Sequence, residues 1–235
     1  MTEGSRSAPR LTVTGPERLD YETARRAQLR LRQDCEDSGG GRNYLMLVEH
    51  PPVITLGQSA DASEVLASEE TLREKGVAVV ESSRGGRVTF HGPGQLVGYP
   101  ILDLRQRGRD LHRYLRDLEA WLIAVCEKFG IAAERIPDRT GVWVGQSKIA
   151  AIGVAARRWC SYHGVALNVS PELSYFDLIV PCGFRDSGVT SLERELDEVP
   201  EWNAVVKGMV DAFGSTFDFP RMERLDSVDV IYEVP

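Results

Sequence analysis

The chain has 235 residues, 42% of them hydrophobic and 27% charged, a composition typical of a globular protein with a substantial core. A net charge of −7 at pH 7 argues against nucleic-acid binding, because a protein that neutralises phosphates needs basic surface. The four cysteines form no CxxC pair, so neither a disulfide framework nor a zinc site is predicted. The N-terminus lacks the apolar core of a secretion signal and no apolar run could span a bilayer, so we expect a cytoplasmic protein that makes no use of a membrane.

Apolar periodicity predicts the elements of the first half of the chain. We expect a flexible tail over residues 1–10, a strand at 11–14, and a helix that Asp20 caps and that ends near Asp37. A nearly all-apolar run at 44–48 predicts a strand buried on both faces, and residues 53–56 continue in extended form. An exposed helix over 68–75 and a second buried strand over 77–80 follow.

The second half alternates strands with two amphipathic helices. We expect a strand over 96–104, a helix from Asp110 to about Phe129, a hairpin of 142–144 with 148–156, a strand over 159–169 and a closing helix over 200–217. Strands dominate the middle without regular βαβ alternation. The prediction is therefore an α+β fold, with one domain over residues 11–235 that has a central mixed sheet flanked by helices.

Residues 84–99, RGGRVTFHGPGQLVGY, contain five glycines, with one histidine and two arginines among them. Glycine permits close backbone approach to a ligand. The stretch therefore indicates either a binding loop or a pair of tight turns that join strands.

Several familiar sites can be excluded. There is no phosphate loop, no GxGxxG after a strand and no HExxH motif. The HGPG sequence at 91–94 is like the oxyanion loop of esterases, but no GxSxG nucleophile elbow accompanies it. Cys160 and His163, three apart on a predicted strand, would point to opposite faces and so would not share a metal.

One cysteine differs from the other three. Cys126 falls on the apolar side of a helix, Cys35 late in a charged helix and Cys160 within a strand, positions typical of packed side chains. Cys182 lies between Pro181 and Gly183 after an apolar run. A rigid turn of this kind suits a nucleophile beside a free backbone N–H, although an ordinary turn gives the same pattern.

Four motifs in order make the pattern specific: RGGRVTFHGPGQ at 84–95, QSKIAAIG at 146–153, HGVALN at 163–168 and PCG at 181–183. Together they closely resemble the octanoyl-[acyl-carrier-protein]:protein N-octanoyltransferases, also called lipoate–protein ligase B enzymes. The resemblance spans about residues 44–192.

The resemblance implies a fold like the catalytic domain of biotin and lipoate protein ligases, and a two-step acyl transfer. Cys182 would take octanoate from the carrier thioester, and Lys148 would activate the thiol and assist attack by the acceptor lysine. The donor would be octanoyl-acyl carrier protein, and the acceptors the lipoyl domains of 2-oxoacid dehydrogenases and the glycine cleavage H protein. Because thioester to thioester to amide runs downhill, no ATP, metal or other cofactor would be needed. The acyl site would be lined by Arg84, Gly85, Gly86, Arg87, Val88, Thr89, Phe90, His91, Ala151, Ile152, Gly153, Gly164, Val165 and Ala166.

Some roles have two interpretations. Arg84 could bind the carrier's phosphopantetheine or anchor its own loop, and His91 could polarise the thioester carbonyl or hold a turn. The small residues of 150–166 could make room for an alkyl chain or let strands pack closely. His163 would be a packed or hydrogen-bonded strand residue. The arginines of 105–116 could form a basic face for the acidic carrier or an ordinary solvated edge.

Two rival functions fit less well. An ATP-dependent ligase of the same fold would have no need of Cys182, and a non-catalytic carrier-binding module would form no covalent adduct.

Overall fold

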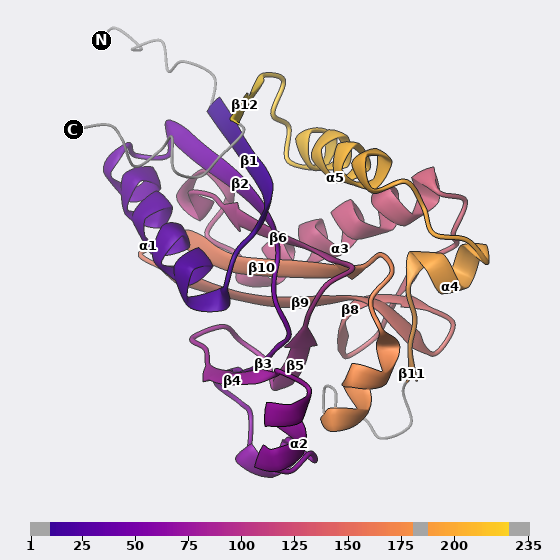
Figure 1. Ribbon diagram of the computed structural model, residues 1–235. Coiled ribbons are helices and arrows are strands. Elements are labelled where there is room, and N and C mark those ends of the chain that lie inside the picture. Colours follow the sequence, from indigo (N-terminus) through magenta and orange to yellow (C-terminus); the bar gives the residue numbers. More distant parts are fainter. Residues whose placement is uncertain (1–9, 181–187, 226–235) are drawn as a thin grey trace, which may run out of the picture.

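The computed structural model describes residues 10–180 and 188–225, which form two sheets and the helices packed on them (Figure 1). The main sheet has the strand order β12-β1-β2-β6-β10-β9-β8-β7, with β11 beside β9. Its strands are β1 (Arg10–Arg18), β2 (Arg42–Glu49), β6 (Gln95–Ile101), β7 (Glu134–Ile136), β8 (Arg139–Val144), β9 (Ser147–Arg157), β10 (Cys160–Asn168), β11 (Gly188–Val189) and β12 (Met222–Leu225). The small sheet has the order β4-β3-β5, from β3 (Val53–Leu56), β4 (Ala78–Glu81) and β5 (Val88–His91).

Both sheets are mixed. In the main sheet β1 runs parallel to β2 and β12, while β6, β10, β9 and β8 are antiparallel neighbours. In the small sheet β3 runs parallel to β4 and antiparallel to β5. The predicted α+β class with a central mixed sheet is confirmed.

Side-chain capping starts the long helices where the sequence predicts. The Asp20 carboxylate accepts from the Thr23 N–H at the start of α1 (Tyr21–Asp37), and the Asp110 carboxylate from the Arg113 N–H at the start of α3 (Leu111–Lys128). The other α-helices are α2 (Glu69–Glu74), α4 (Leu192–Leu196) and α5 (Trp202–Thr216). Short 3₁₀ segments are η1 (Ala62–Glu64), η2 (Leu104–Arg107) and η3 (Leu173–Leu178).

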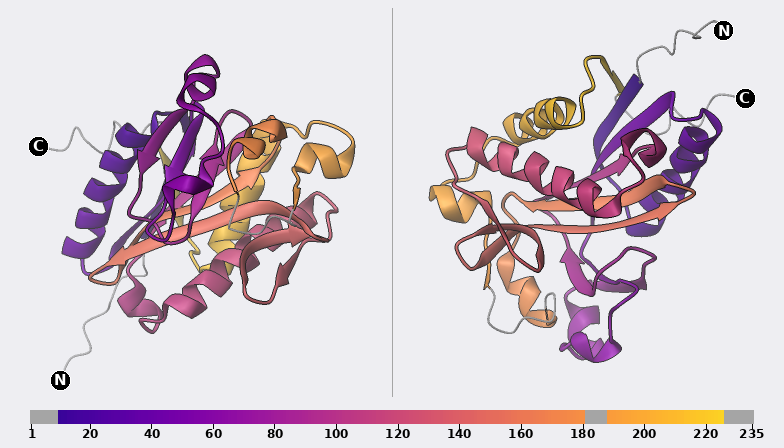
Figure 2. Two further views of the ribbon diagram at one scale, coloured as in Figure 1. Left: turned by 90° about the horizontal axis from the view of Figure 1, so that it is seen from below. Right: turned by 180° about the vertical axis from the view of Figure 1, so that it is seen from behind.

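Strand alternation divides the apolar side chains between the two faces of the main sheet. On β6, Leu96 joins the core under α3 and α5, whereas Val97 and Tyr99 face α1. Gly98 lies on the α3 side, where a Cβ would stand 2.9 Å from the Trp121 ring. Figures 1 and 2 show α3 and α5 together on one face, with the small sheet beyond the other. The face shared by α1 and the small sheet is the one that holds the site.

The structure differs from the sequence prediction at several elements. The predicted buried strand at 77–80 is β4, an edge strand whose Val79 is 42% exposed, because only β3 pairs with it. The glycine-rich stretch contains a strand of its own, β5, and β7, α4 and β12 had no clear sequence signal. Over the described ranges, no helix is long and apolar enough to cross a membrane.

Candidate active site

A cavity of about 230 Å³ lies where β5, β9, β10 and the start of α1 converge. Most of its wall comes from two kinds of segment: the glycine-rich loop with β5, and small residues in the middle of β9 and β10. Its lining residues are Tyr21, Arg84, Gly86, Arg87, Val88, Thr89, His91, Val97, Tyr99, Asp138, Arg139, Thr140, Lys148, Ala151, Ile152, Gly153, His163, Gly164, Val165 and Ala166.

Most residues that the resemblance assigns to the acyl site lie at this cavity. Its wall includes Arg84, all of residues 86–91 except Phe90, residues 151–153 and residues 164–166. Phe90 does not, because its ring points into the small core of the β3–β5 sheet and stacks on Tyr175 at 4.9 Å. Gly85 does not either; its N–H donates to the Val154 carbonyl and so attaches the loop to β9.

Sequence reasoning missed part of the wall. Tyr21 enters from the first turn of α1, and Val97 and Tyr99 enter from β6. Asp138 comes from the turn before β8, and Arg139 and Thr140 from the start of that strand. Tyr99 belongs to the glycine-rich stretch, so its position in the sequence could have marked it as a site residue. Nothing in the local sequence marks Tyr21 or residues 138–140.

Arg84 is an anchor for its own loop. Its side chain is buried, and its guanidinium donates to the Thr55 carbonyl at 2.7 Å, to Thr55 Oγ1 at 2.8 Å and to the Gly85 carbonyl at 3.1 Å. These bonds connect the loop to β3 and leave the cationic group beside the cavity wall. Of the two interpretations of Arg84, the geometry supports the anchor.

A β-bulge turns Lys148 toward the cavity. The β8–β9 register pairs Val142 with Ala150 but Trp143 with Lys148, so Ile149 is an extra residue on β9. Ile149 and Ala150 both pack into the core under α3, and Lys148 therefore reaches the opposite face. In an unbroken strand Lys148 would share the core face of Ala150.

The Lys148 side chain is 8% exposed and held between two neighbours. Its Nζ lies 4.7 Å from the centre of the Trp143 ring, within cation–π range. Gly141, at φ +127°, leaves space on the other side: a Cβ there would lie 3.3 Å from Lys148 Cε and 2.8 Å from the Ala150 carbonyl oxygen. Gly141 is itself fixed by its N–H, which donates to Glu119 Oε1.

Cys182, the predicted nucleophile, lies outside the described residues. The chain resumes at β11, which runs parallel to β9 with Val189 opposite Lys148, and the next N–H, of Thr190, donates to the Lys148 carbonyl at 3.0 Å. The other three cysteines are buried, as expected for packed side chains. Burial raises the pKa of Cys126 to about 12.

Three buried histidines surround this face of the sheet, and all have lowered pKa values. Burial, followed by electrostatic interaction with His50 and Arg84, lowers the pKa of His91 to about 3. Burial likewise lowers the pKa of His163 to about 4 and lowers that of His50. His163 pairs through Nε2 with Ser83 Oγ at 3.0 Å and also lines the cavity. No three His, Cys, Asp or Glu side chains in the described part of the chain gather as a metal site.

The two central glycines of the wall make room for backbone. A Cβ at Gly164 would lie 2.1 Å from the Gly98 carbonyl oxygen of β6, and one at Gly153 would lie 3.0 Å from both Arg84 Cδ and the Gly85 oxygen. Gly164 thus permits close strand packing and Gly153 permits the loop to dock. Space for a ligand comes instead from Ala151 and Ala166.

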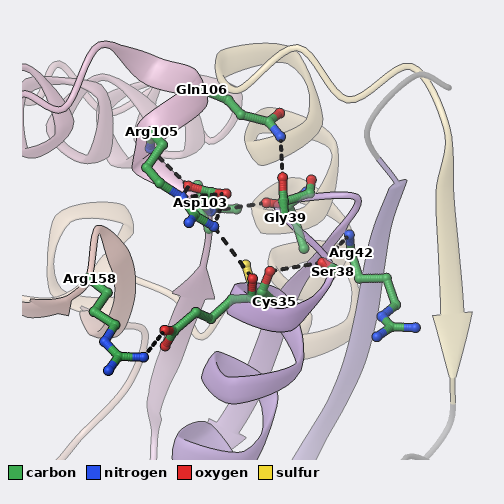
Figure 3. A network of polar contacts seen from close by, with 12 residues as sticks. Cys35, Ser38, Gly39, Arg42, Asp103, Arg105, Gln106 and Arg158 are labelled. Carbon is green, nitrogen blue, oxygen red and sulfur yellow. Dashed lines mark hydrogen bonds and ion pairs between the residues drawn. The ribbon is translucent and has the colours of Figure 1, made fainter. Parts of the chain in front are cut away.

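The arginines of 105–116 are largely occupied with neighbours. Arg105 donates to the buried Asp103 carboxylate beside the C-terminal end of α1 (Figure 3). Arg107 donates to the Phe217 carbonyl and lies over the Phe217 ring, and Arg116 pairs with Glu119. Moreover, α3 packs on the sheet face away from the cavity. The geometry therefore gives no support to this segment as a carrier-docking face.

Comparison with known proteins matches residues 20–214 to the lipoyl protein ligase A/B catalytic domain. An octanoyltransferase of Chloroflexus aggregans is 46% identical over 218 residues, which cover 92% of this chain and 98% of that protein. An octanoyltransferase of Myxococcus xanthus is 43% identical over 219 residues, 91% of this chain but only 61% of that longer protein.

Solved structures show the same fold at low sequence identity. A lipoate protein ligase of T. acidophilum with bound lipoic acid has a TM-score of 0.70 at 16% identity, covering 96% of this chain and 92% of that chain. Lipoate-protein ligase A bound with ATP also has a TM-score of 0.70 at 16% identity, covering 94% and 89%. The fold predicted from the motif resemblance is confirmed.

Proposed function

The chain belongs to the family of lipoyl protein ligase A/B catalytic domains, and we propose that it is an octanoyltransferase, as the relatives at 43% and 46% identity are named. The substrates would be an octanoyl thioester on a carrier protein and the lysine amine of a lipoyl domain. The observation that carries the proposal is the position of Lys148 at the wall of a cavity built largely from the family's motifs.

The cavity is suited to a small, largely apolar ligand. Its volume of about 230 Å³ lies just below the range of roughly 300–1,000 Å³ that is usual for ligand pockets. Val97, Ala151, Ile152 and Ala166 supply apolar wall, while Arg84, His91 and Lys148 are the polar groups around it. A mainly apolar pocket with a few convergent polar groups is typical of a small-ligand site.

In the first step, the Cys182 thiolate would attack the carbonyl carbon of the carrier thioester. A bond from Cys182 sulfur to the acyl carbon forms, the carrier's C–S bond breaks, and the carrier thiol leaves after taking up a proton. A free thiol is only a few per cent ionised at pH 7. A nearby ammonium favours the thiolate, and this is the role we assign to Lys148.

In the second step, the acceptor lysine amine would attack the Cys182 thioester. The amide C–N bond forms, the C–S bond breaks, and one amine proton passes to the departing sulfur, a transfer that Lys148 would assist. The enzyme returns to its starting state without ATP. This separates the proposal from an ATP-dependent ligase of the same fold.

Intact-mass spectrometry after incubation with octanoyl carrier protein, without ATP, tests the proposal. The wild type should gain one octanoyl group, Cys182→Ala should gain none, and Lys148→Ala should gain it more slowly. Cys126→Ala is the matched control, because that thiol is buried and should leave the adduct intact. An absence of adduct on the wild type, or an adduct that survives in Cys182→Ala, would contradict the proposal.

A further inference from the structure

A chain of buried side-chain amides connects His91 to the strand edge beside Lys148. His91 Nδ1 lies 3.1 Å from Gln95 Oε1, and Gln95 Nε2 donates to the Phe90 carbonyl at 3.2 Å and to Asn168 Oδ1 at 3.0 Å. Asn168 Nδ2 in turn donates to the Thr190 carbonyl at 2.9 Å. His91, Gln95, Asn168 and Thr190 are all less than 8% exposed.

The direction of every bond in this chain is determined by its two backbone carbonyls. A carbonyl oxygen only accepts, so Thr190 requires the amide nitrogen of Asn168 and Phe90 requires the amide nitrogen of Gln95. If either side-chain amide were turned over, two oxygens would face each other in a buried site. Gln95 therefore presents its oxygen to His91.

His91 must then carry its proton on Nδ1. Because Gln95 Oε1 has no hydrogen, the Nδ1–H of His91 is the donor of their bond. The ring is neutral near pH 7, since its pKa is lowered to about 3. A neutral imidazole protonated on Nδ1 has only a lone pair on Nε2. No hydrogen bond to Nε2 occurs within residues 10–180 and 188–225, and His91 lines the cavity.

We propose that His91 gives the cavity a fixed hydrogen-bond acceptor, Nε2, which binds an N–H group of a substrate, and that Gln95 and Asn168 are positioning residues that hold this tautomer. The inference rests on the proposed function for the identity of the substrate. Two N–H groups could reach the site: the amine of the acceptor lysine, or an amide of the carrier's pantetheine arm. The acyl carbonyl oxygen is excluded as a partner, because two acceptors would face each other. The alternative in which His91 polarises the thioester carbonyl is thus rejected.

The tautomer can be measured without any substrate. In ¹⁵N NMR of histidine-labelled protein, with the His91 signals assigned by their loss in His91→Phe, we expect a protonated Nδ1 and an unprotonated Nε2 near pH 7. A proton on Nε2 in the wild type would overturn the proposal. This experiment does not depend on octanoyl transfer, so its failure is distinguishable from failure of the proposed function.

Gln95→Glu then tests whether the acceptor matters. A carboxylate beside Nδ1 favours the imidazolium, which would turn Nε2 into a donor. We expect the imidazolium in the spectrum and a loss of about 5- to 100-fold in one half-reaction. A loss in enzyme acylation by octanoyl carrier assigns the pantetheine amide, and a loss in transfer to the lipoyl domain assigns the lysine amine. Unchanged or faster rates in both would overturn the proposal.

A second variant covers the case in which Gln95→Glu does not fold. Gln95→Met removes the oxygen that holds Nδ1–H, so both neutral tautomers should appear in the spectrum and the same half-reaction should slow. The exposed His112→Gln is the matched control and should change neither. A Gln95→Met protein with a single Nδ1–H tautomer would show that Gln95 does not position His91.

Discussion

Gly141→Ala tests whether the glycine before the β8–β9 hairpin sets the position of Lys148. The glycine has φ +127°, a region that L side chains rarely adopt, and the new Cβ would lie 2.8 Å from the Ala150 carbonyl oxygen. A strained backbone of this kind costs about 1–3 kcal/mol. For a chain of this size that corresponds to a drop in Tm of roughly 3–10 °C. The same Cβ would lie 3.3 Å from Lys148 Cε, so the lysine must also move.

Two assays separate the strain from the displacement of Lys148. Thermal unfolding measures the strain. If Lys148 has the role proposed above, octanoyl transfer at a temperature well below Tm should fall about 10- to 100-fold, because displacing a reacting group by about 1 Å is costly. Gly145→Ala is the matched control: it also has positive φ, at +56°, but its Cβ would meet nothing within 4 Å. The control should lose stability and keep its kcat/KM. If Gly141→Ala keeps the kcat/KM of Gly145→Ala, Gly141 does not position the lysine.

The cavity wall, the Arg84 anchor and the two buried histidines can each be tested by one further measurement. Ala151→Leu extends into the cavity by three carbon atoms and should cut octanoyl transfer at least about tenfold while sparing hexanoyl transfer; equal loss for both chain lengths would contradict the acyl-site assignment. Thr55→Val removes the hydroxyl that accepts from Arg84 Nε and Nη2 and should lower the free energy of unfolding by about 1–3 kcal/mol, whereas Thr55→Ser should not. The pKa of His91 is lowered to about 3 and that of His163 to about 4, whereas both residues have the ordinary value of 6.5 in the unfolded chain. As the pH falls below 6.5, the unfolded chain therefore takes up protons before the folded chain does. The free energy of unfolding should fall by about 2 kcal/mol per histidine at pH 5. His91→Gln should remove its share in acid denaturation, and an unchanged pH dependence would refute the attribution.

Local chemistry made the caps and the long helices predictable. Asp20 and Asp110 are N-caps in the structure because a carboxylate satisfies N–H groups that the first turn leaves unpaired, wherever the helix packs. The all-apolar run of β2 was predictable for a similar reason, since a strand covered on both faces needs apolar residues throughout. The edge position of β4 was not, because its apolar sequence is indistinguishable from that of a central strand.

Assigning roles to the residues of the candidate site required both the sequence motif and the fold. The motif brought Arg84, His91 and Lys148 into consideration, but it could not distinguish an anchoring arginine from a ligand-binding one. That distinction depends on Thr55, which lies on β3, 29 positions away from Arg84. Likewise the protonated nitrogen of His91 depends on the Phe90 and Thr190 carbonyls, and the hydrogen bonds that these carbonyls accept form only in the folded chain.

The bulge on β9 determines which side of the sheet Lys148 occupies. Lys148 reaches the cavity side because the bulge turns both Ile149 and Ala150 toward the core under α3. Deleting Ile149 would remove the bulge and leave Lys148 opposite Trp143, still on the cavity side, whereas regular pleating with Ile149 retained would direct the ammonium group into the core. The position of the lysine therefore depends on a backbone irregularity, which another apolar side chain at 149 would leave in place.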